Sequence, residues 1–179
     1  MMEDIASHIM DITTNSIAAQ ATHISISVER RFDTQVLVLT VADDGVGMDQ
    51  ETARKVQDPF FSTKTGRKVG LGIPLLKGTA ETTGGSFTLS SERGRGTYIR
   101  ATFDGRHPDL PPLGNLRDTF LVLIVSHPDV DFTFSCLVDE KEFHLATEDI
   151  RHELDGVPVN HPEVINFLTK YLDEHLRFI

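Results

Sequence analysis

Alternating apolar and polar residues near the N-terminus predict a pair of β-strands. In residues 23–31, isoleucine and valine alternate with polar side chains, so this strand is expected to have one solvated face. The run from Val36 to Val41 is apolar on both of its faces and carries few charges. Since only a short turn at residues 32–34 separates the two runs, we expect them to form a hairpin.

Residues 3–21 have the spacing of an amphipathic helix. One stripe of this helix is formed by Ile5, Ile9, Ile12 and Ser16. His8, Asp11 and Asn15 follow each other at intervals of three and four, so they share a neighbouring face. Such a face is most often simply solvated, but it could also present a carboxylate and an amide to a ligand.

The next hundred residues alternate between helical and strand-like patterns. We expect a short helix at residues 49–57 with Asp49 as its N-cap, a helix at 73–83, and a second hairpin of strands at 86–91 and 97–103. Two adjacent strand pairs with helices between them predict an α+β fold. Its sheet should be mixed but mostly antiparallel, with helices on one face.

The composition changes after residue 104, where three prolines lie close together. We therefore predict an N-terminal domain at residues 1–104 and a small C-terminal α+β extension of unknown function at 105–179. Its predicted elements are a helix at 115–126, strands at 131–138 and 142–146, a helix capped by Thr147, and a helix opened by Pro162. The apolar stretch at 115–125 and the last helix could cover the bare face of the sheet or pair with another subunit.

Charge and cysteine content exclude several classes of function. A formal net charge of -10 argues against a general nucleic-acid binder, because neutralising phosphates needs a basic face. The single cysteine, Cys136, cannot form an internal disulfide or a thiolate metal site. The N-terminus lacks the pattern of a signal peptide, and no apolar run reaches the length of a membrane helix, so we expect a cytoplasmic protein without membrane contact.

The turn after the second strand holds two carboxylates and two glycines in the run Val-Ala-Asp-Asp-Gly-Val-Gly-Met, from Val41 to Met48. Gly45 and Gly47 allow a sharp turn and close approach of a ligand to the backbone. Asp43 could accept a hydrogen bond from an amino group. An ordinary Asp-Gly hairpin turn explains the same residues equally well.

Residues 58–72 have no regular period and are rich in glycine, hydroxyl groups and cations. The run Gly70-Leu71-Gly72 lies at the start of the helix predicted at 73–83, where free N–H groups and the helix dipole attract anions. Lys64 lies in the loop that leads to it. Phosphate is the obvious ligand, although a flexible basic loop would look the same.

A purine nucleoside triphosphate with a metal ion satisfies all three elements together. Its exocyclic amine would suit Asp43, and its phosphates would suit the glycines and Lys64. Mg²⁺ takes oxygen ligands and usually bridges phosphates to one or two protein oxygens, of which Asn15 could supply one.

Five motifs in this order resemble the boxes of the GHKL ATP-binding superfamily, which includes gyrase, heat-shock chaperone ATPases, MutL, sensor histidine kinases and anti-sigma-factor kinases. The motifs are Asp11-x-x-x-Asn15, Asp43-x-Gly45-x-Gly47, Phe60-Phe61 with Thr63-Lys64, Gly70-Leu71-Gly72, and Gly94-x-Gly96-Thr97. The resemblance covers residues 3–103 and is greatest to the histidine kinases and anti-sigma kinases. It implies a Bergerat-type α/β sandwich.

The resemblance also implies a role for each matched residue. Asp43 would bind adenine, Gly45 and Gly47 would shape the floor of the pocket, and Thr97 would lie near the base. Asn15 would be the Mg²⁺ ligand, and the phosphates would contact Lys64 and the run Gly70-Leu71-Gly72. Asp11 stands where hydrolytic relatives have a glutamate that orients water. Because aspartate is one methylene shorter, the resemblance implies ATP binding more firmly than hydrolysis.

We therefore expect a stand-alone cytoplasmic ATP-binding protein that transfers phosphate from Mg·ATP to an unidentified protein partner. Two alternatives are slow ATP hydrolysis, and an ATP-responsive switch without catalysis whose loop at 59–69 orders around the nucleotide. A homodimer is possible. His8 lies on the helix of the ATP-binding domain itself, so we expect it to pack or to lie at the edge of the pocket rather than to accept phosphate.

Overall fold

The computed structural model describes residues 4–60 and 71–177 of the chain. Its helices are α1 (Ile5–Ala18), α2 (Gln50–Lys55), α3 (Gly72–Thr82), α4 (Leu116–Ser126), α5 (Thr147–Glu153) and α6 (Pro162–His175). Its strands are β1 (His23–Arg31), β2 (Val36–Asp43), β3 (Ser86–Glu92), β4 (Gly96–Asp104), β5 (Asp131–Val138) and β6 (Lys141–Ala146).

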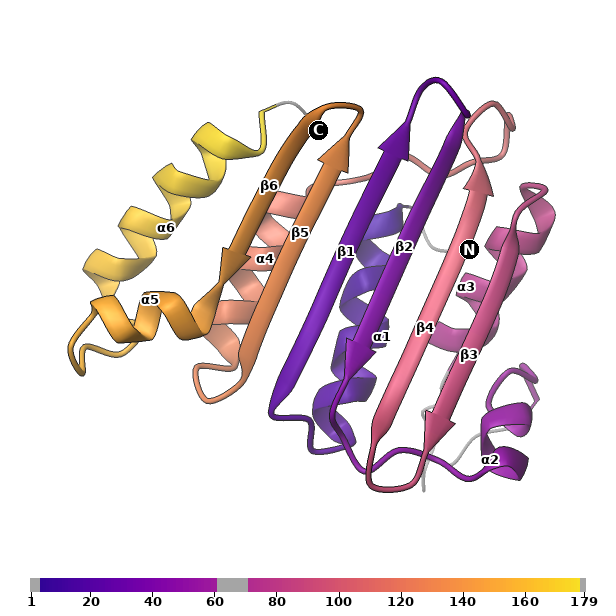
Figure 1. Cartoon of the computed structure of the whole chain (residues 1–179), viewed down its shortest axis with the longest axis horizontal. Helices are drawn as coiled ribbons and strands as arrows, with labels where there is room; N and C mark the ends of the chain where they lie inside the picture. The colour runs from indigo at the N-terminus through magenta and orange to yellow at the C-terminus, as the bar shows by residue number, and fades with distance from the viewer. Residues whose placement is uncertain (1–3, 61–70, 178–179) are drawn as a thin grey trace.

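All of these strands belong to one sheet of order β3-β4-β2-β1-β5-β6 (Figure 1). Four of the five strand pairs are antiparallel, and β1 pairs with β5 in parallel. Both predicted hairpins, β1-β2 and β3-β4, are present. The predicted mixed, mostly antiparallel sheet is therefore confirmed.

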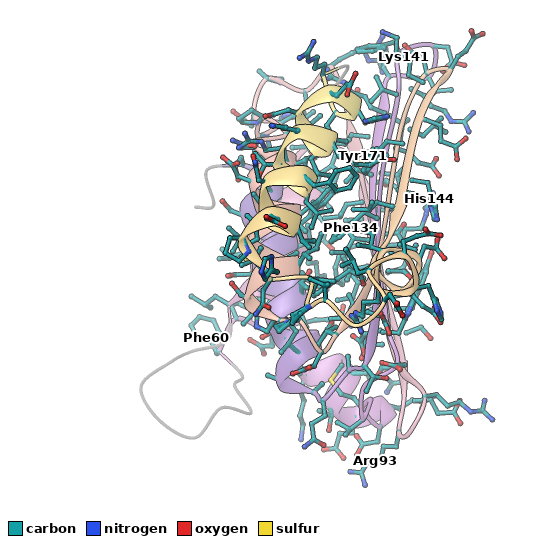
Figure 2. All side chains as sticks on the ribbon, turned by 90° about the vertical axis from the view of Figure 1, so that its left-hand side faces the viewer. Phe60, Arg93, Phe134, Lys141, His144 and Tyr171 are labelled. Atoms are coloured by element: carbon teal, nitrogen blue, oxygen red, sulfur yellow. The ribbon has the colours of Figure 1, made fainter. Side chains whose placement is uncertain are left out.

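Helices α1, α3, α4 and α6 lie against one face of this sheet (Figures 1 and 2). The stripe predicted for α1 is buried: Ile5 and Ile9 are fully covered, and Ser16 nearly so. Since strand residues alternate between the faces, the covered face receives the isoleucines of β1, while its serines face outward. The fold is thus a two-layer α/β sandwich with one open face.

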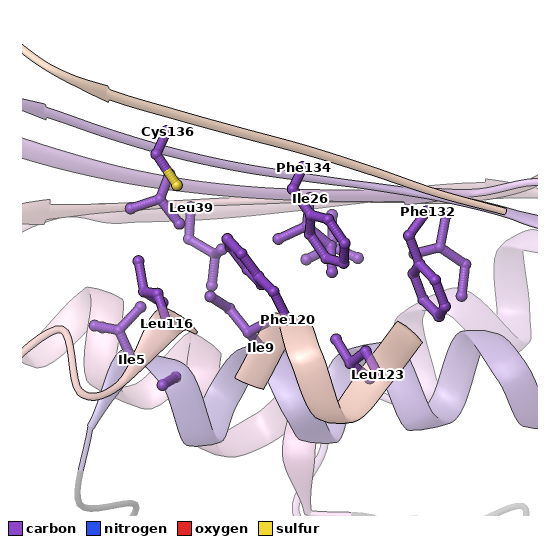
Figure 3. Close-up of a cluster of buried hydrophobic side chains, with 14 of the residues drawn as sticks. Ile5, Ile9, Ile26, Leu39, Leu116, Phe120, Leu123, Phe132, Phe134 and Cys136 are labelled. Atoms are coloured by element: carbon purple, nitrogen blue, oxygen red, sulfur yellow. The ribbon is translucent and has the colours of Figure 1, made fainter. Parts of the chain in front are cut away.

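Residues 106–177 extend this sheet and do not cover its open face. Strand β5 completes the free edge of β1, and α4 packs in the same layer as α1. Phe120 of α4 stacks on Phe134 of β5 with their ring centroids 4.2 Å apart, and both lie in one cluster with Ile9 and Ile26 (Figure 3). The core is therefore shared between the two predicted segments, and their division at residue 104 stays a prediction.

One predicted helix cap is wrong. Thr147 is the first residue of α5, but its side chain does not cap that helix. It accepts a hydrogen bond from the backbone N–H of Phe132 at 2.8 Å instead. The hydroxyl is buried beside β5. Leaving the buried N–H of Phe132 without an acceptor would cost more free energy than leaving the exposed end of α5 uncapped.

Within the described ranges, every helix is too short or too polar to cross a lipid bilayer.

Candidate nucleotide site

Asp43, the last residue of β2, is held in place by three hydrogen bonds from three different segments. Its Oδ2 accepts from the hydroxyl of Ser16 on α1 at 2.6 Å. Its Oδ1 accepts from the backbone N–H groups of Gly45 at 3.0 Å and Thr97 at 3.2 Å. A carboxylate has about four acceptor positions, so this part-buried group keeps capacity for one further donor.

Glycines bring the turn after β2 against the hairpin between β3 and β4. Gly47 has φ +63°, and a Cβ there would lie 2.0 Å from the carbonyl oxygen of Glu92. Gly96 has φ +86°, and its Cβ would lie 1.8 Å from the carbonyl oxygen of Asp43. No other residue type fits at such distances without a backbone shift, so both glycines hold Asp43 where it is.

The neighbouring carboxylate, Asp44, has a different task. It is exposed and accepts hydrogen bonds from the hydroxyl and N–H of Thr22 and from the N–H of His23, all at the start of β1. Loss of some hydration raises the pKa of Asp44, but these hydrogen bonds outweigh it, so the pKa lies below its ordinary value. Asp44 therefore ties the end of β2 to the start of β1, which is a structural role.

The second part of the site lies between α1 and α3. Asp11 and Asn15 share the face of α1 that the sequence predicted, and Gly72 opens α3 beside them. A Cβ on Gly72 would lie 3.2 Å from the Cβ of Asp11, 3.4 Å from its Oδ2 and 3.5 Å from the Nδ2 of Asn15. Residues more than fifty positions apart thus meet at the N-terminus of α3.

The N-terminus of α3 keeps backbone donors for an anion. Its N-cap residue, Leu71, forms no side-chain hydrogen bond to the helix. Because the first N–H groups of a helix have no partner within it, they attract negative charge. Leu71 is exposed, whereas Lys64 and Gly70, which were also predicted to contact phosphate, lie outside the described residues.

His8, on the same side of α1, packs in the interior, which is one of its two predicted roles. Its side chain is fully buried, and its Nε2 lies 3.3 Å from the hydroxyl of Thr79 on α3. Within the described part of the chain its Nδ1 is buried without a hydrogen-bond partner. Burial lowers the pKa of His8 from 6.5 to about 4, and the charge of Asp4 opposes this only partly.

We expect His8 to make the protein less stable as the pH falls from about 6.5 to about 4. In this window the unfolded chain binds a proton that the folded chain rejects, so the free energy of unfolding drops by on the order of 2 kcal/mol. The measurement is urea unfolding of wild type and His8→Gln between pH 7 and pH 4.5. The slope of the free energy of unfolding against pH should be smaller in His8→Gln than in wild type.

A hollow of about 310 Å³ at the same end of the sheet is a separate feature. Its lining includes Asp43 and Thr97, but also Ala42, Ser90 and Tyr98. By strand alternation the last three point to the open face of the sheet, away from α1. This hollow is therefore not the space between Asp43 and the helices.

The family of histidine kinase-, DNA gyrase B- and HSP90-like ATPases matches residues 3–107. This range contains every site residue described above. The chain belongs to this family. Its sheet with helices on one face is the Bergerat-type α/β sandwich that the sequence predicted, and membership supports ATP binding by this domain.

Relatives with similar sequences are bacterial sensor proteins. The heme sensor protein HssS of Staphylococcus saprophyticus is 30% identical over 52% of this chain and 20% of its own length. The sensor kinase CckA of Brucella abortus is 37% identical over 36% of this chain and 7% of its own length. The chain thus spans a fifth or less of the length of these relatives.

Among solved structures, the N-terminal domain of a DNA repair protein has a similar fold, with a TM-score of 0.55 at 14% identity. The similarity covers 81% of this chain and 53% of that chain. Residues 3–107 alone could not give that coverage, so the shared fold includes part of the C-terminal segment.

Two residues of the site were missing from the sequence prediction. Ser16, assigned to the core stripe of α1, orients Asp43. Ser91 of β3 accepts from the N–H of Met48 at 2.8 Å, and its Oγ lies 3.0 Å from the hydroxyl oxygen of Thr97. Ser16 is the polar residue in a stripe of isoleucines, which could have indicated a polar contact there. Ser91 lies in a strand of ordinary alternation, so that pattern gave no such indication.

Proposed function

We propose that this protein binds Mg·ATP and transfers a phosphate from it to a partner protein. The observation that supports this most is the meeting of Asp11 and Asn15 with the start of α3, a short distance along α1 from Ser16 and Asp43. Asp43, proposed to bind the base, and the N-terminus of α3, proposed to bind the phosphates, thus both lie against α1. Sensor kinases among the relatives support the same class of reaction.

The residues present suit a magnesium ion that is carried on phosphates. In the described ranges, no group of three histidine, cysteine or acidic side chains could hold a metal ion alone. Mg²⁺ is commonly held by one or two protein oxygens together with phosphate oxygens and water. The side-chain oxygen of Asn15 would be that protein ligand, and the ion would neutralise charge on the phosphates.

Asp11 would act beside the terminal phosphate. It is exposed on α1, and its carboxylate lies beside Gly72 at the start of α3, where we propose that the phosphates bind. In phosphoryl transfer, positioning and charge neutralisation do most of the work. We therefore expect Asp11 to orient the acceptor, with the shorter side chain favouring a protein acceptor over water.

Thermal unfolding with and without nucleotide tests the proposal directly. At an ATP concentration 100-fold above Kd, binding adds about 2.7 kcal/mol to the free energy of unfolding, a rise of several degrees in Tm. Mg·ATP should give this rise and Mg²⁺ alone should not. Equal Tm values with and without Mg·ATP would overturn the assignment.

Radiolabelled ATP distinguishes the proposed reaction from the two alternatives. Label on a co-purified protein without free phosphate indicates a kinase, and free phosphate without labelled protein indicates an ATPase. Capture of a partner only in the presence of ATP, with neither product, indicates a switch.

We expect Asn15→Ala to bind ATP without any dependence on Mg²⁺. The substitution removes the proposed metal ligand from a half-buried position of α1. Tm without nucleotide is measured alongside, to show that the variant is folded. Isothermal titration with ATP in Mg²⁺ and in EDTA measures the dependence, and Asn15→Asp, which keeps an oxygen at this place, should retain it. Persistent Mg²⁺ dependence in Asn15→Ala would count against this ligand.

A further inference from the structure

Strand β6 forms one edge of the sheet and leaves part of its backbone unpaired. The N–H groups of Asp131 and Asp139 donate toward β1 at 2.9 and 3.0 Å, so alternate residues of β5 such as Cys136 direct theirs toward β6. Cys136 is paired with Phe143. The residues on either side of Phe143 therefore direct their N–H and C=O groups away from the sheet.

These two residues, Glu142 and His144, are exposed. A strand edge with free donors and acceptors is a template for an added strand, and many proteins block it with prolines, bulges or a covering element. In the described part of the chain, β6 contains neither a proline nor a bulge, and its register with β5 is continuous.

An aromatic stripe follows the outer flank of α6, next to this edge. Tyr171 stacks on Phe167 with ring centroids 6.0 Å apart and on His175 with centroids 4.1 Å apart. Phe167 is 60% exposed, so the stripe offers apolar surface to solvent. The stripe has the i, i+4, i+8 spacing of one helix face.

The stripe faces past the edge of the sheet. Asp173, on the other flank of α6, pairs with Arg117 of α4 at 2.8 Å. Tyr171 lies beside Phe143 of β6, with ring centroids 6.3 Å apart. Figure 1 shows α6 outward of β6, and Figure 2 shows it in the helix layer, with Tyr171 between helix and sheet and His144 on the open face. A strand added to the outer edge of β6 would thus lie next to the aromatic face of α6.

We propose that β6 and α6 together bind an extended peptide segment of a partner protein as a seventh strand. Its backbone would pair with Glu142 and His144, and its inward side chains would cover Phe167 and Tyr171. Backbone pairing supplies affinity in this mode of recognition, and pockets for alternate side chains supply specificity. The proposed segment is apolar at alternate positions, because only every second side chain meets the aromatic stripe.

The part of the chain that contains β6 and α6 is acidic, which favours a basic partner segment. Residues 139–177 contain ten aspartates and glutamates against four lysines and arginines. Glu142 lies on the open face of β6, directly beside the place of an added strand, where a lysine would be its cross-strand neighbour. We therefore infer a partner with lysine or arginine between its apolar residues.

A second copy of this chain suits the edge less well than a peptide does. Two strands pair about 4.8 Å apart, whereas packed helices need roughly 8–10 Å between their axes. In this chain α6 lies outward of β6 in the helix layer. If a second copy paired its β6 with this β6, the α6 helices of the two copies would compete for the same space. A single extended segment meets no such obstruction.

Peptide binding to β6 and α6 can be measured by fluorescence anisotropy without nucleotide, so this test is independent of the proposed reaction with ATP. The probe is a fluorescein-labelled peptide of alternating lysine and valine, eight residues long. We expect saturable binding, and no saturable binding of the peptide with glutamate in place of lysine. A peptide of the same composition with its lysines and valines in two blocks should bind at least tenfold more weakly.

Two substitutions test whether the peptide binds at β6 and α6. Phe167→Ser removes the exposed ring and should weaken binding about tenfold, whereas Val122→Ser, at a 49% exposed position of α4, should not. His144→Pro removes an outward N–H at an edge position that tolerates proline, and should abolish binding with little change in Tm.

Three results would overturn the proposal. The first is equal binding of the alternating and block peptides, which indicates charge attraction alone. The second is unchanged binding by both Phe167→Ser and His144→Pro. The third is a concentration-dependent dimer in sedimentation that His144→Pro dissociates, which would assign the edge to a second copy.

Discussion

Asp43→Asn is expected to fold normally and to lose ATP binding. The asparagine oxygen can accept from the N–H groups of Gly45 and Thr97, and its amide nitrogen can donate to the hydroxyl of Ser16. That hydroxyl can in turn donate to the carbonyl of Ile12, which is 3.4 Å away. The hydrogen bonds within the protein therefore survive. The second N–H of the asparagine amide, however, would point at the amino group of adenine, where Asp43 offers an acceptor.

The expected loss is about 3 kcal/mol, or roughly a hundredfold in Kd, because a charged hydrogen bond is replaced by two facing donors. Isothermal titration measures it, and Tm without ATP should stay within a few degrees of wild type. Asp44→Asn is a matched control, because Asp44 also accepts two N–H groups and one hydroxyl but faces the start of β1. Equal ATP affinity of Asp43→Asn and wild type would remove the proposed adenine site.

The chain truncated after residue 107 is expected not to fold. The truncation keeps every residue of the family match but removes α4 and β5, which cover α1 and the edge of β1. Ile9 and Ile26, both almost fully buried, would then be exposed to water together with the side of α1 that α4 covers. Circular dichroism should show no cooperative melting transition.

A point substitution tests the same packing without truncation. Phe120 is fully buried, and Phe120→Ala should lower the free energy of unfolding by about 3–5 kcal/mol, since it leaves a cavity between α1, α4 and β5. Phe167→Ala, at an exposed position, should cost less than about 1 kcal/mol. A truncated chain that melts cooperatively and binds ATP would show instead that residues 1–107 fold independently, in line with the predicted division near residue 104.

Local patterns in the sequence predicted most of the fold. The alternation in residues 23–31 and the isoleucine spacing of α1 identify elements because each depends only on which side faces the core. The parallel pairing of β1 with β5 could not be predicted in this way. It joins strands separated by several helices, and nothing in either strand's own pattern specifies its neighbour.

The candidate site was predictable at positions that only one or two residue types can occupy. Gly96 and Gly47 stand at positive φ against another backbone, so their identity is a strong signal. Asp11 and Asn15 were placed on one face by helical spacing alone. The orientation of Asp43 was not predictable, because it depends on Ser16 and Thr97, which reach it from other segments.

The parallel pairing of β1 with β5 also has a consequence for synthesis of the protein. About 100 residues separate the two strands, so the edge of β1 stays uncovered while the ribosome completes the chain. At roughly 5–20 residues per second, this interval lasts on the order of 5 to 20 s. During it, we expect the part already synthesised to expose the backbone edge of β1 and one side of α1, the kind of surface on which folding intermediates aggregate and chaperones act.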